Sequence, residues 1–260
     1  MIDKKDPYVL KNGTLRNKLN IRNREKLNEA QRDITFSKFL DISKQFRSKF
    51  DVNYIKAIHK HIFEDIFDWA GEFRCVPIVK EEIVIPKQSL DYTPYQHIEK
   101  ELQNVLDEMN NTNWDVLPLD EKASLFTQDL AKLWRVHPFR DGNTRTTLTF
   151  AKQFSEEHNF PLDLGFLLDH LSRQYDENGN ITRYSIRDKF VLAALPDEFS
   201  PEPEHLTYLM HEAMKSGISK QISNLQNTLD GRTKKFKNQE KEKDRKIKKF
   251  KEQEKEKLER

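Results

Sequence analysis

Apolar residues recur at every third or fourth position over most of this 260-residue chain. Ile55, Ile58 and Ile62, between Tyr54 and Ile66, show that spacing. One turn of α-helix takes 3.6 residues, so the spacing places these side chains on a single helix face. The same pattern predicts helices near residues 27–39, 54–66, 95–106, 119–133, 148–154, 186–195 and 202–215. The chain is therefore predicted to be mainly helical.

The segment from Arg74 to Pro86, RCVPIVKEEIVIP, departs from the helical pattern. Two runs rich in Val and Ile flank a polar centre, as in a short β-hairpin with a charged turn. Pro77 suits an edge strand because it has no N–H to donate to a neighbouring strand. We predict a hairpin here and no other convincing β-structure. A lone hairpin is marginally stable in water, so it must lean on the helices or on a partner.

Charge is unevenly distributed although the net charge is only +2. Residues 231–260 hold 14 basic and 7 acidic residues, whereas residues 1–230 hold 31 basic and 36 acidic residues. The body is mildly acidic, so no nucleic-acid partner is expected. We predict a domain over residues 1–217, with its core at about 50–195, whose last helix ends at Gly217. The rest, 218–260, carries a thin apolar seam and is predicted to be a charged tail, coiled-coil-like or disordered.

Cys75 is the only cysteine, which excludes an intramolecular disulfide and fits a reducing compartment. The first residues, MIDKKDPYVL, lack the apolar stretch of a signal peptide. No apolar run reaches the roughly 20 residues needed to cross a bilayer, so no membrane span is expected. We expect a cytoplasmic protein, or one secreted into a host cell without a cleaved N-terminal signal.

The stretch HPFRDGNTR, from His137 to Arg145, has the features of an anion-binding loop. Pro138 cannot continue the helix that precedes it, and Gly142 permits a backbone turn that other residues resist. A new helix is predicted to begin near Asn143. Its first N–H groups lack intrahelical partners and lie at the positive end of the helix dipole, so they can cradle an anion, usually phosphate.

The charged residues of this stretch fit phosphate chemistry. Arg145, in the first helical turn, can hold a second phosphate through two N–H groups. Asp141 would repel phosphate unless a cation intervened, so it is a candidate Mg²⁺ ligand. His137, with an ordinary pKa near 6.5, suits a general base for an incoming hydroxyl, and Phe139 is expected to be buried and to fix the loop. The alternative is a plain helix–loop–helix turn, with His137 as a cap and Arg145 as a surface charge.

The stretch resembles the Fic family signature, His-Pro-Phe-x-Asp/Glu-Gly-Asn-Gly/Lys-Arg. The resemblance extends to DIFDWAGEFR (residues 65–74), to the hairpin segment and to YVLKNGTLRNKLNI near the start, and covers about residues 8–215. It implies an all-α fold, with a Fic-type helical core, a small β-hairpin flap over the active site and a charged helical or disordered C-terminal tail. It also implies an enzyme that transfers AMP from ATP to a hydroxyl of a target protein.

Carried over by position, the resemblance gives each motif residue a role. His137 would be the general base, and Asp141 would hold Mg²⁺. Gly142 and Asn143 would form the anion hole around the α-phosphate of ATP. Arg145 would hold the β-phosphate.

The resemblance also implies roles outside the phosphate site. Phe139 would be the residue pinned in the core. The flap, about Arg74 to Pro86, would align the target's backbone by strand addition. Lys80 in the flap would pin the target or the nucleotide.

Two positions depart from the family pattern. Thr144, counted among the nucleotide-binding residues, stands where AMP-transferring members have Gly and phosphorylating members have Lys. Leu148 stands where many members carry a second Arg that contacts the γ-phosphate, a charge-assisted contact worth about 1.5–3 kcal/mol. Transfer of another nucleotide or phosphate-containing group, or a catalytically weak binding module, therefore stay open beside AMP transfer.

Many Fic proteins are silenced by a helix bearing Ser/Thr-x-x-x-Glu-Gly/Asn, whose Glu pairs with the second Arg. This chain has no such pattern. The nearest match, Ser200 to Glu204, is interrupted by prolines. A separate inhibitory protein chain is therefore one possible partner, beside inhibition by another mechanism or none.

Overall fold

Helices make up most of the chain in the computed structural model, which describes residues 6–41, 49–80, 82–85 and 90–258. The helices are α1 (Arg24–Asp41), α2 (Val52–Phe63), α3 (Ile98–Asn111), α4 (Leu119–Val136), α5 (Asn143–Glu157), α6 (Leu164–Leu168), α7 (Ile186–Ala193) and α8 (Glu204–Leu258). Short 3₁₀ turns lie at Tyr95–His97, Trp114–Val116 and Asp197–Phe199. The predicted all-α class is confirmed, and every predicted helix is present, although α6 was not predicted.

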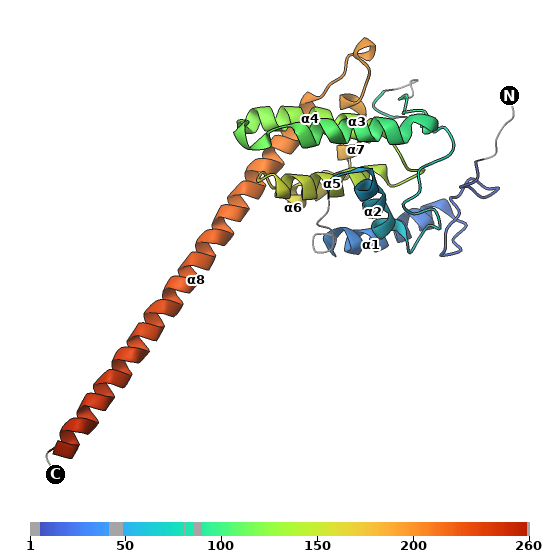
Figure 1. Cartoon of the computed structure of the whole chain (residues 1–260). Coiled ribbons are helices and arrows are strands. Elements are labelled where there is room, and N and C mark those ends of the chain that lie inside the picture. Colours follow the sequence, from blue (N-terminus) through green and yellow to red (C-terminus); the bar gives the residue numbers. More distant parts are fainter. Residues whose placement is uncertain (1–5, 42–48, 81, 86–89, 259–260) are drawn as a thin grey trace.

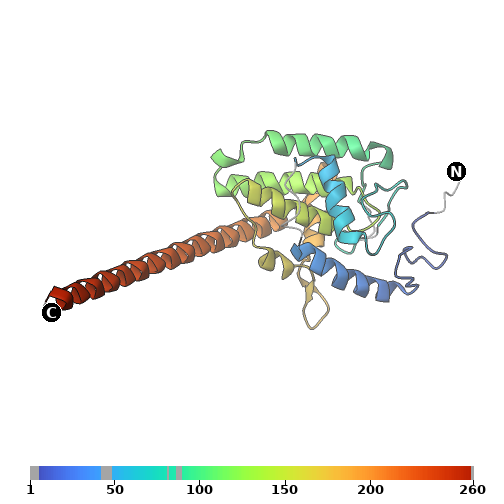
Figure 2. The ribbon, with the colours of Figure 1, turned by 60° about the horizontal axis from the view of Figure 1, so that its bottom comes forward.

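The centre of the body is α4, which packs against α3, α5, α7 and α8. Helix α2 packs against α5 and α3, and α1 packs against α2. Helices α1 and α3 lie on opposite sides of the body (Figures 1 and 2). Four buried rings, from Trp114, Phe126, Phe154 and Phe160, meet with centroids 5.2–5.9 Å apart. Such rings bury large apolar areas, so this cluster packs α4, through Phe126, against α5, through Phe154.

The hairpin predicted for Arg74–Pro86 is not found: residues 74–80 and 82–85 contain no β-strand, while Glu81 and Pro86 lie outside the described residues. The physical reason is that contacts other than strand pairing take up backbone groups of this segment. The guanidinium of Arg74 donates to the carbonyl of Val76, and the backbone N–H of Arg74 donates to the carbonyl of Pro138. Pro77 has no N–H to donate to a neighbouring strand.

The described residues do contain a two-stranded antiparallel sheet, at a different place. Strand β1 (Gln174–Tyr175) pairs with β2 (Ile181–Arg183) around the polar turn DENGN. The side chain of Asp176 accepts the N–H groups of Asn178 and Asn180, which closes this turn. The short strands gave no apolar alternation in the sequence, and they were not predicted.

The helix predicted to end at Gly217 continues to Leu258, and α8 projects from the body as one long rod (Figure 1). Gly217 is not a cap but a crossing point, because a Cβ built there would lie 1.9 Å from the carbonyl oxygen of Pro161. Beyond it, Ile222, Leu225 and Leu229 of the predicted seam are exposed. None of the helices in the described ranges combines the length and apolar character that crossing a bilayer requires.

Replacing Gly217→Ala is expected to destabilise the body by about 1–3 kcal/mol, since the new methyl forces α8 away from the Pro161 backbone. Chemical denaturation followed by circular dichroism measures the loss. Ser219→Ala, an exposed change two residues along the same helix, serves as the control and should leave stability within about 0.5 kcal/mol. Equal stability of both variants would contradict the close crossing.

Candidate active site

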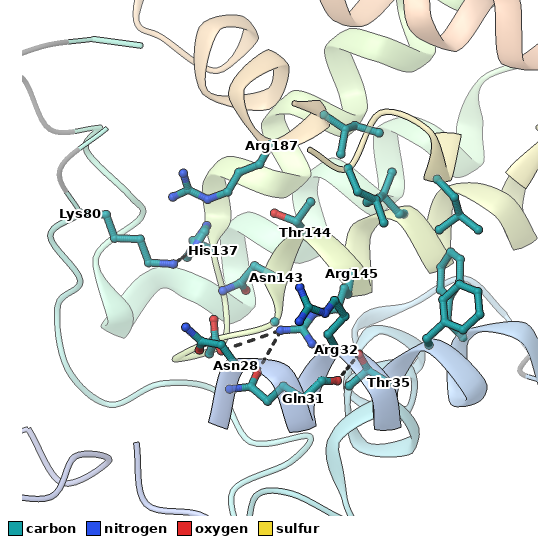
Figure 3. Close-up of a pocket in the computed structure, with 18 residues that line it drawn as sticks. Asn28, Gln31, Arg32, Thr35, Lys80, His137, Asn143, Thr144, Arg145 and Arg187 are labelled. Atoms are coloured by element: carbon teal, nitrogen blue, oxygen red, sulfur yellow. Dashed lines mark hydrogen bonds and ion pairs between the residues drawn. The ribbon is translucent and has the colours of Figure 1, made fainter. Parts of the chain in front are cut away.

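The loop of residues 137–142, called here the motif loop, borders a cavity of about 400 Å³, called the motif cavity (Figure 3). Its walls come from α1, the flap segment, the start of α5 and the start of α7. The structure brings together seven of the predicted site residues here: Lys80, His137, Asp141, Gly142, Asn143, Thr144 and Arg145. Phe139 does not line the cavity.

His137 ends α4 in a left-handed backbone conformation (φ +47°), which is uncommon outside glycine. Its Nδ1 lies 3.3 Å from the carbonyl oxygen of Trp134, which only accepts, so we assign the ring proton to Nδ1. The lone pair is then on Nε2, which lies 3.2 Å from Nζ of Lys80 and accepts from it (Figure 3).

The environment of His137 keeps the imidazole neutral. Its side chain is buried, and Tyr92 stacks on it with ring centroids 4.0 Å apart. Burial lowers the pKa of His137 well below its ordinary value, and the positive charges of Lys80 and Arg187 lower it further. A neutral imidazole with its lone pair on Nε2 is the form that a general base requires.

Arg74, which sequence reasoning did not select, fastens the flap segment to the motif loop. Its guanidinium is buried and donates to the carbonyls of His137 (2.8 Å), Val76 (3.0 Å) and Thr93 (2.5 Å). Its backbone N–H donates to Pro138 at 2.9 Å. One side chain thus fixes the backbone of His137 relative to the flap.

Gly142 and Asn143 shape the start of α5. Gly142 has φ +81°, and a Cβ there would lie 2.4 Å from the ring of Phe63, so no larger residue fits. The amide of Asn143 closes the loop on Phe139, donating to its carbonyl (2.8 Å) and accepting its N–H (2.9 Å). This side chain is therefore used within the loop. The groups at this helix start that are suited to an anion are the first backbone N–H groups, which have no intrahelical acceptors.

Arg145 lies in the first turn of α5 and lines the cavity, so it is not a plain surface charge. Its guanidinium donates to Thr35 Oγ1 and Gln31 Oε1 of α1, both at 3.0 Å (Figure 3). It lies over the ring of Phe63, 4.6 Å from the ring centroid. It also lies 3.9 Å from the Asp141 carboxylate. Helix α1 thereby holds the guanidinium in place.

Asp141 meets the requirements of a Mg²⁺ ligand shared with a phosphate. Burial opposes its ionisation, but Arg145 and Lys80 outweigh that effect and hold the pKa of the carboxyl below its usual range. No group of three or more His, Cys, Asp or Glu side chains in the described ranges could hold a metal by itself. A single ionised carboxylate suits Mg²⁺ that takes its other ligands from phosphate and water.

Two other predicted residues make packing contacts. Phe139 is fully buried and stacks on His59 with centroids 3.7 Å apart. The hydroxyl of Thr144 accepts the indole N–H of Trp134 at 3.0 Å, which ties the start of α5 to the end of α4. A glycine at position 144 would lack that bond.

Sequence reasoning missed two arginines of the cavity, Arg32 on α1 and Arg187 on α7. Arg187 pairs with the buried carboxylate of Glu82 at 2.5 and 2.6 Å, and the hydroxyl of Tyr92 donates to the same carboxylate at 3.2 Å. Neither arginine lies in a recognisable motif. Their places depend on contacts between distant parts of the chain, which no local pattern reveals.

His59 links the motif loop to the turn after α2, and this predicts a dependence of stability on pH. Its Nδ1 accepts the N–H of Gly71 (2.8 Å), and its Nε2 donates to the carbonyl of Asp141 (3.1 Å). Burial lowers the pKa of His59 to about 3, while an unfolded histidine titrates near 6.5. Between these pH values the unfolded chain binds one more proton than the folded chain. The free energy of unfolding is therefore highest above pH 6.5 and decreases as the pH falls.

His59→Gln is therefore expected to flatten the loss of stability below pH 6.5 by up to about 1.4 kcal/mol per pH unit. Urea unfolding at about pH 5 and about pH 7 measures the slope. His97→Gln, at an exposed histidine, is the control and should keep the wild-type slope. A wild-type slope in the His59 variant would show that this group does not contribute.

Comparison with known proteins gives relatives of one kind. Residues 49–155 match the model of the Fic/DOC family. The chain is 28% identical over 182 residues to the protein adenylyltransferase VbhT of Bartonella schoenbuchensis, covering 69% of this chain but only 36% of that one. It is 27% identical over 165 residues to the probable protein adenylyltransferase Fic of Escherichia coli K12, covering 61% and 76%.

Solved structures show the same fold. The N-terminal Fic domain of an effector protein from Bartonella quintana, with bound ADP, matches with a TM-score of 0.60 at 23% identity, over 79% of this chain and 93% of that one. BepC from Bartonella tribocorum, with bound AMPPNP, matches with a TM-score of 0.59 at 21% identity, over 79% and 95%. The chain therefore carries a domain of the Fic/DOC family, matched over residues 49–155.

Proposed function

We propose that this protein is a protein adenylyltransferase that transfers AMP from ATP to a hydroxyl side chain of a target protein. The observation that carries the proposal is the place of His137: a neutral imidazole whose Nε2 lone pair borders the cavity into which the start of α5, Asp141 and Arg145 also converge. The relatives named adenylyltransferases and the related folds with bound AMPPNP or ADP support this choice of reaction.

In the proposed reaction, Nε2 of His137 accepts the proton of the target hydroxyl as the oxygen attacks the α-phosphorus of ATP. The new bond joins that oxygen to phosphorus, and the bond from the α-phosphorus to the bridging oxygen breaks, so pyrophosphate leaves. Backbone N–H groups at the start of α5 hold the phosphate oxygens, and Arg145 binds the phosphate that departs. Lys80 donates to Nε2 in the present structure, so it must turn to the nucleotide or the target before the proton is accepted.

Mg²⁺, held by Asp141 and the phosphates of ATP, would neutralise charge on the departing pyrophosphate. The target is proposed to dock along the flap segment, although the described residues of this segment form no β-strand. Val79 and Ile83 on either side of Lys80 are 78% and 62% exposed, so they offer apolar contacts next to the cavity.

Radiolabelled nucleotides test the proposal directly. The full chain is incubated with a cell lysate and ATP labelled at either the α- or the γ-phosphate. Transfer of AMP labels proteins from the α-position only, whereas transfer of phosphate labels them from the γ-position. Label from the γ-position alone would replace the proposal by phosphorylation, and no label above that of a His137→Ala control would reject both. Parallel reactions with α-labelled GTP, UTP and CTP identify the nucleotide used.

A further inference from the structure

The motif cavity contains more positive charge than its motif residues account for. Four cationic side chains line it, from Arg32, Lys80, Arg145 and Arg187, against one carboxylate, that of Asp141. An arrangement of this kind favours a ligand with several negative charges. The question is which of the cations remain available to such a ligand.

Three of the four cations already have partners. Arg187 is paired with Glu82 through two N–H groups, which compensates its charge. Arg145 is bound by α1 and lies 3.9 Å from Asp141, and Lys80 donates to His137. Within the part of the chain that the structure describes, Arg32 makes no hydrogen bond or ion pair. Its guanidinium is the uncompensated charge of the cavity.

Helix α1 brings Arg32 to the end of the cavity where Arg145 lies. Gln31, the residue before it, accepts from Arg145, and Thr35, one turn later, does the same (Figure 3). Leu148 also lines the cavity and supplies no charge to a ligand. A second guanidinium near Arg145 therefore comes from α1 and not from α5.

The helix that carries Arg32 is well anchored. Leu27 and Phe39 are buried in the core, and Lys38 forms an ion pair with Asp65 at 2.9 Å beyond the end of α2. A side chain on a fixed helix loses less freedom on binding than one on a loose segment. Helix α1 lies outside residues 49–155, so the family match does not point to it.

The geometry points to Arg32 as a phosphate-binding residue that, beside Arg145, takes the β- and γ-phosphates of the nucleotide. The assignment rests on the proposed function, because it requires a nucleoside triphosphate in the motif cavity. AMP lacks the β- and γ-phosphates and so would not reach Arg32, whereas ATP would. Arg32 is thus a residue that distinguishes triphosphate from monophosphate.

Binding of ATP, ADP and AMP to the full chain, measured by isothermal titration calorimetry with Mg²⁺ present, tests the assignment. Arg32→Ala is expected to weaken ATP binding about tenfold, as loss of one charge-assisted contact would, and to change AMP binding less than about twofold. Arg32→Lys, which keeps the charge but not the planar fork, should fall between wild type and Arg32→Ala. Arg24→Ala removes the same charge from the exposed start of α1, away from the cavity, and should bind all three nucleotides as wild type does.

The outcomes separate this assignment from the function on which it rests. If wild type binds ATP and Arg32→Ala binds it equally tightly, the assignment fails while nucleotide binding stands. If Arg32→Ala weakens ATP and AMP by the same factor, the side chain supports the site as a whole and the assignment also fails. If wild type binds no nucleotide, the proposed function itself fails. Circular dichroism of each variant shows whether its fold is retained.

Discussion

His137→Ala is expected to lower the rate of AMP transfer about 10²- to 10⁴-fold, the range typical for loss of a positioned general base. The substitution removes Nε2, the acceptor proposed for the target's proton, and leaves Asp141, Arg145 and the start of α5 in place. Transfer from α-labelled ATP gives the rate, and calorimetry gives the affinity for ATP. We expect the rate to fall while the affinity changes little.

A matched change at another histidine guards against a general effect. His97→Ala alters an exposed side chain in the turn before α3 and should leave both rate and affinity unchanged. Transfer that persists in His137→Ala at the wild-type rate would show that the imidazole is not the base. A fall in affinity as large as the fall in rate would instead indicate that His137 stabilises the loop and does not act as the general base.

Gly142→Ala is expected to destabilise the protein by about 2–5 kcal/mol and to abolish transfer. At φ +81° an alanine is strained by about 1–2 kcal/mol, and its Cβ would lie 2.4 Å from the ring of Phe63, so the motif loop must also shift. Because the start of α5 moves with the loop, the N–H groups there lose their place in the cavity. Denaturant unfolding and the transfer assay measure the two effects.

Gly179→Ala isolates the contact from the backbone strain. Gly179 has the same φ of +81°, but a Cβ there meets nothing within 4 Å. Both variants share the strain, so the extra loss in Gly142→Ala measures the clash with Phe63. The double variant Phe63→Leu, Gly142→Ala relieves part of it. Equal stability of the two single glycine variants would contradict the close approach.

Local signals in the sequence predicted the helices and the motif loop well. The apolar spacing located α1 to α5, α7 and α8, because one face of each is buried in a common core. Pro138 and Gly142 predicted a loop, and α5 begins at Asn143 as expected. The roles assigned to the motif residues remain proposals, supported by the cavity in which they meet.

Two local signals in the sequence gave wrong predictions. Val and Ile in the flap segment favoured strands, but Arg74 and the motif loop engage the backbone groups that a hairpin would pair. Gly217 was interpreted as a helix end, whereas the structure uses it for the close approach of α8 to Pro161. In both cases a contact from a distant part of the chain overrode the local preference. The division of the chain near residue 217 stays a prediction.

The sequence by itself determined the helical class, the turn between α4 and α5 and the residue types that this turn carries, because these depend on neighbours along the chain. Only the tertiary structure decided which groups surround that turn. Arg74 fastens it to the flap, Gln31 and Thr35 of α1 hold Arg145, and Arg32 adds a charge that no motif contains. Such contacts join residues up to 114 positions apart, and their pairing follows from how the helices pack and not from any local pattern.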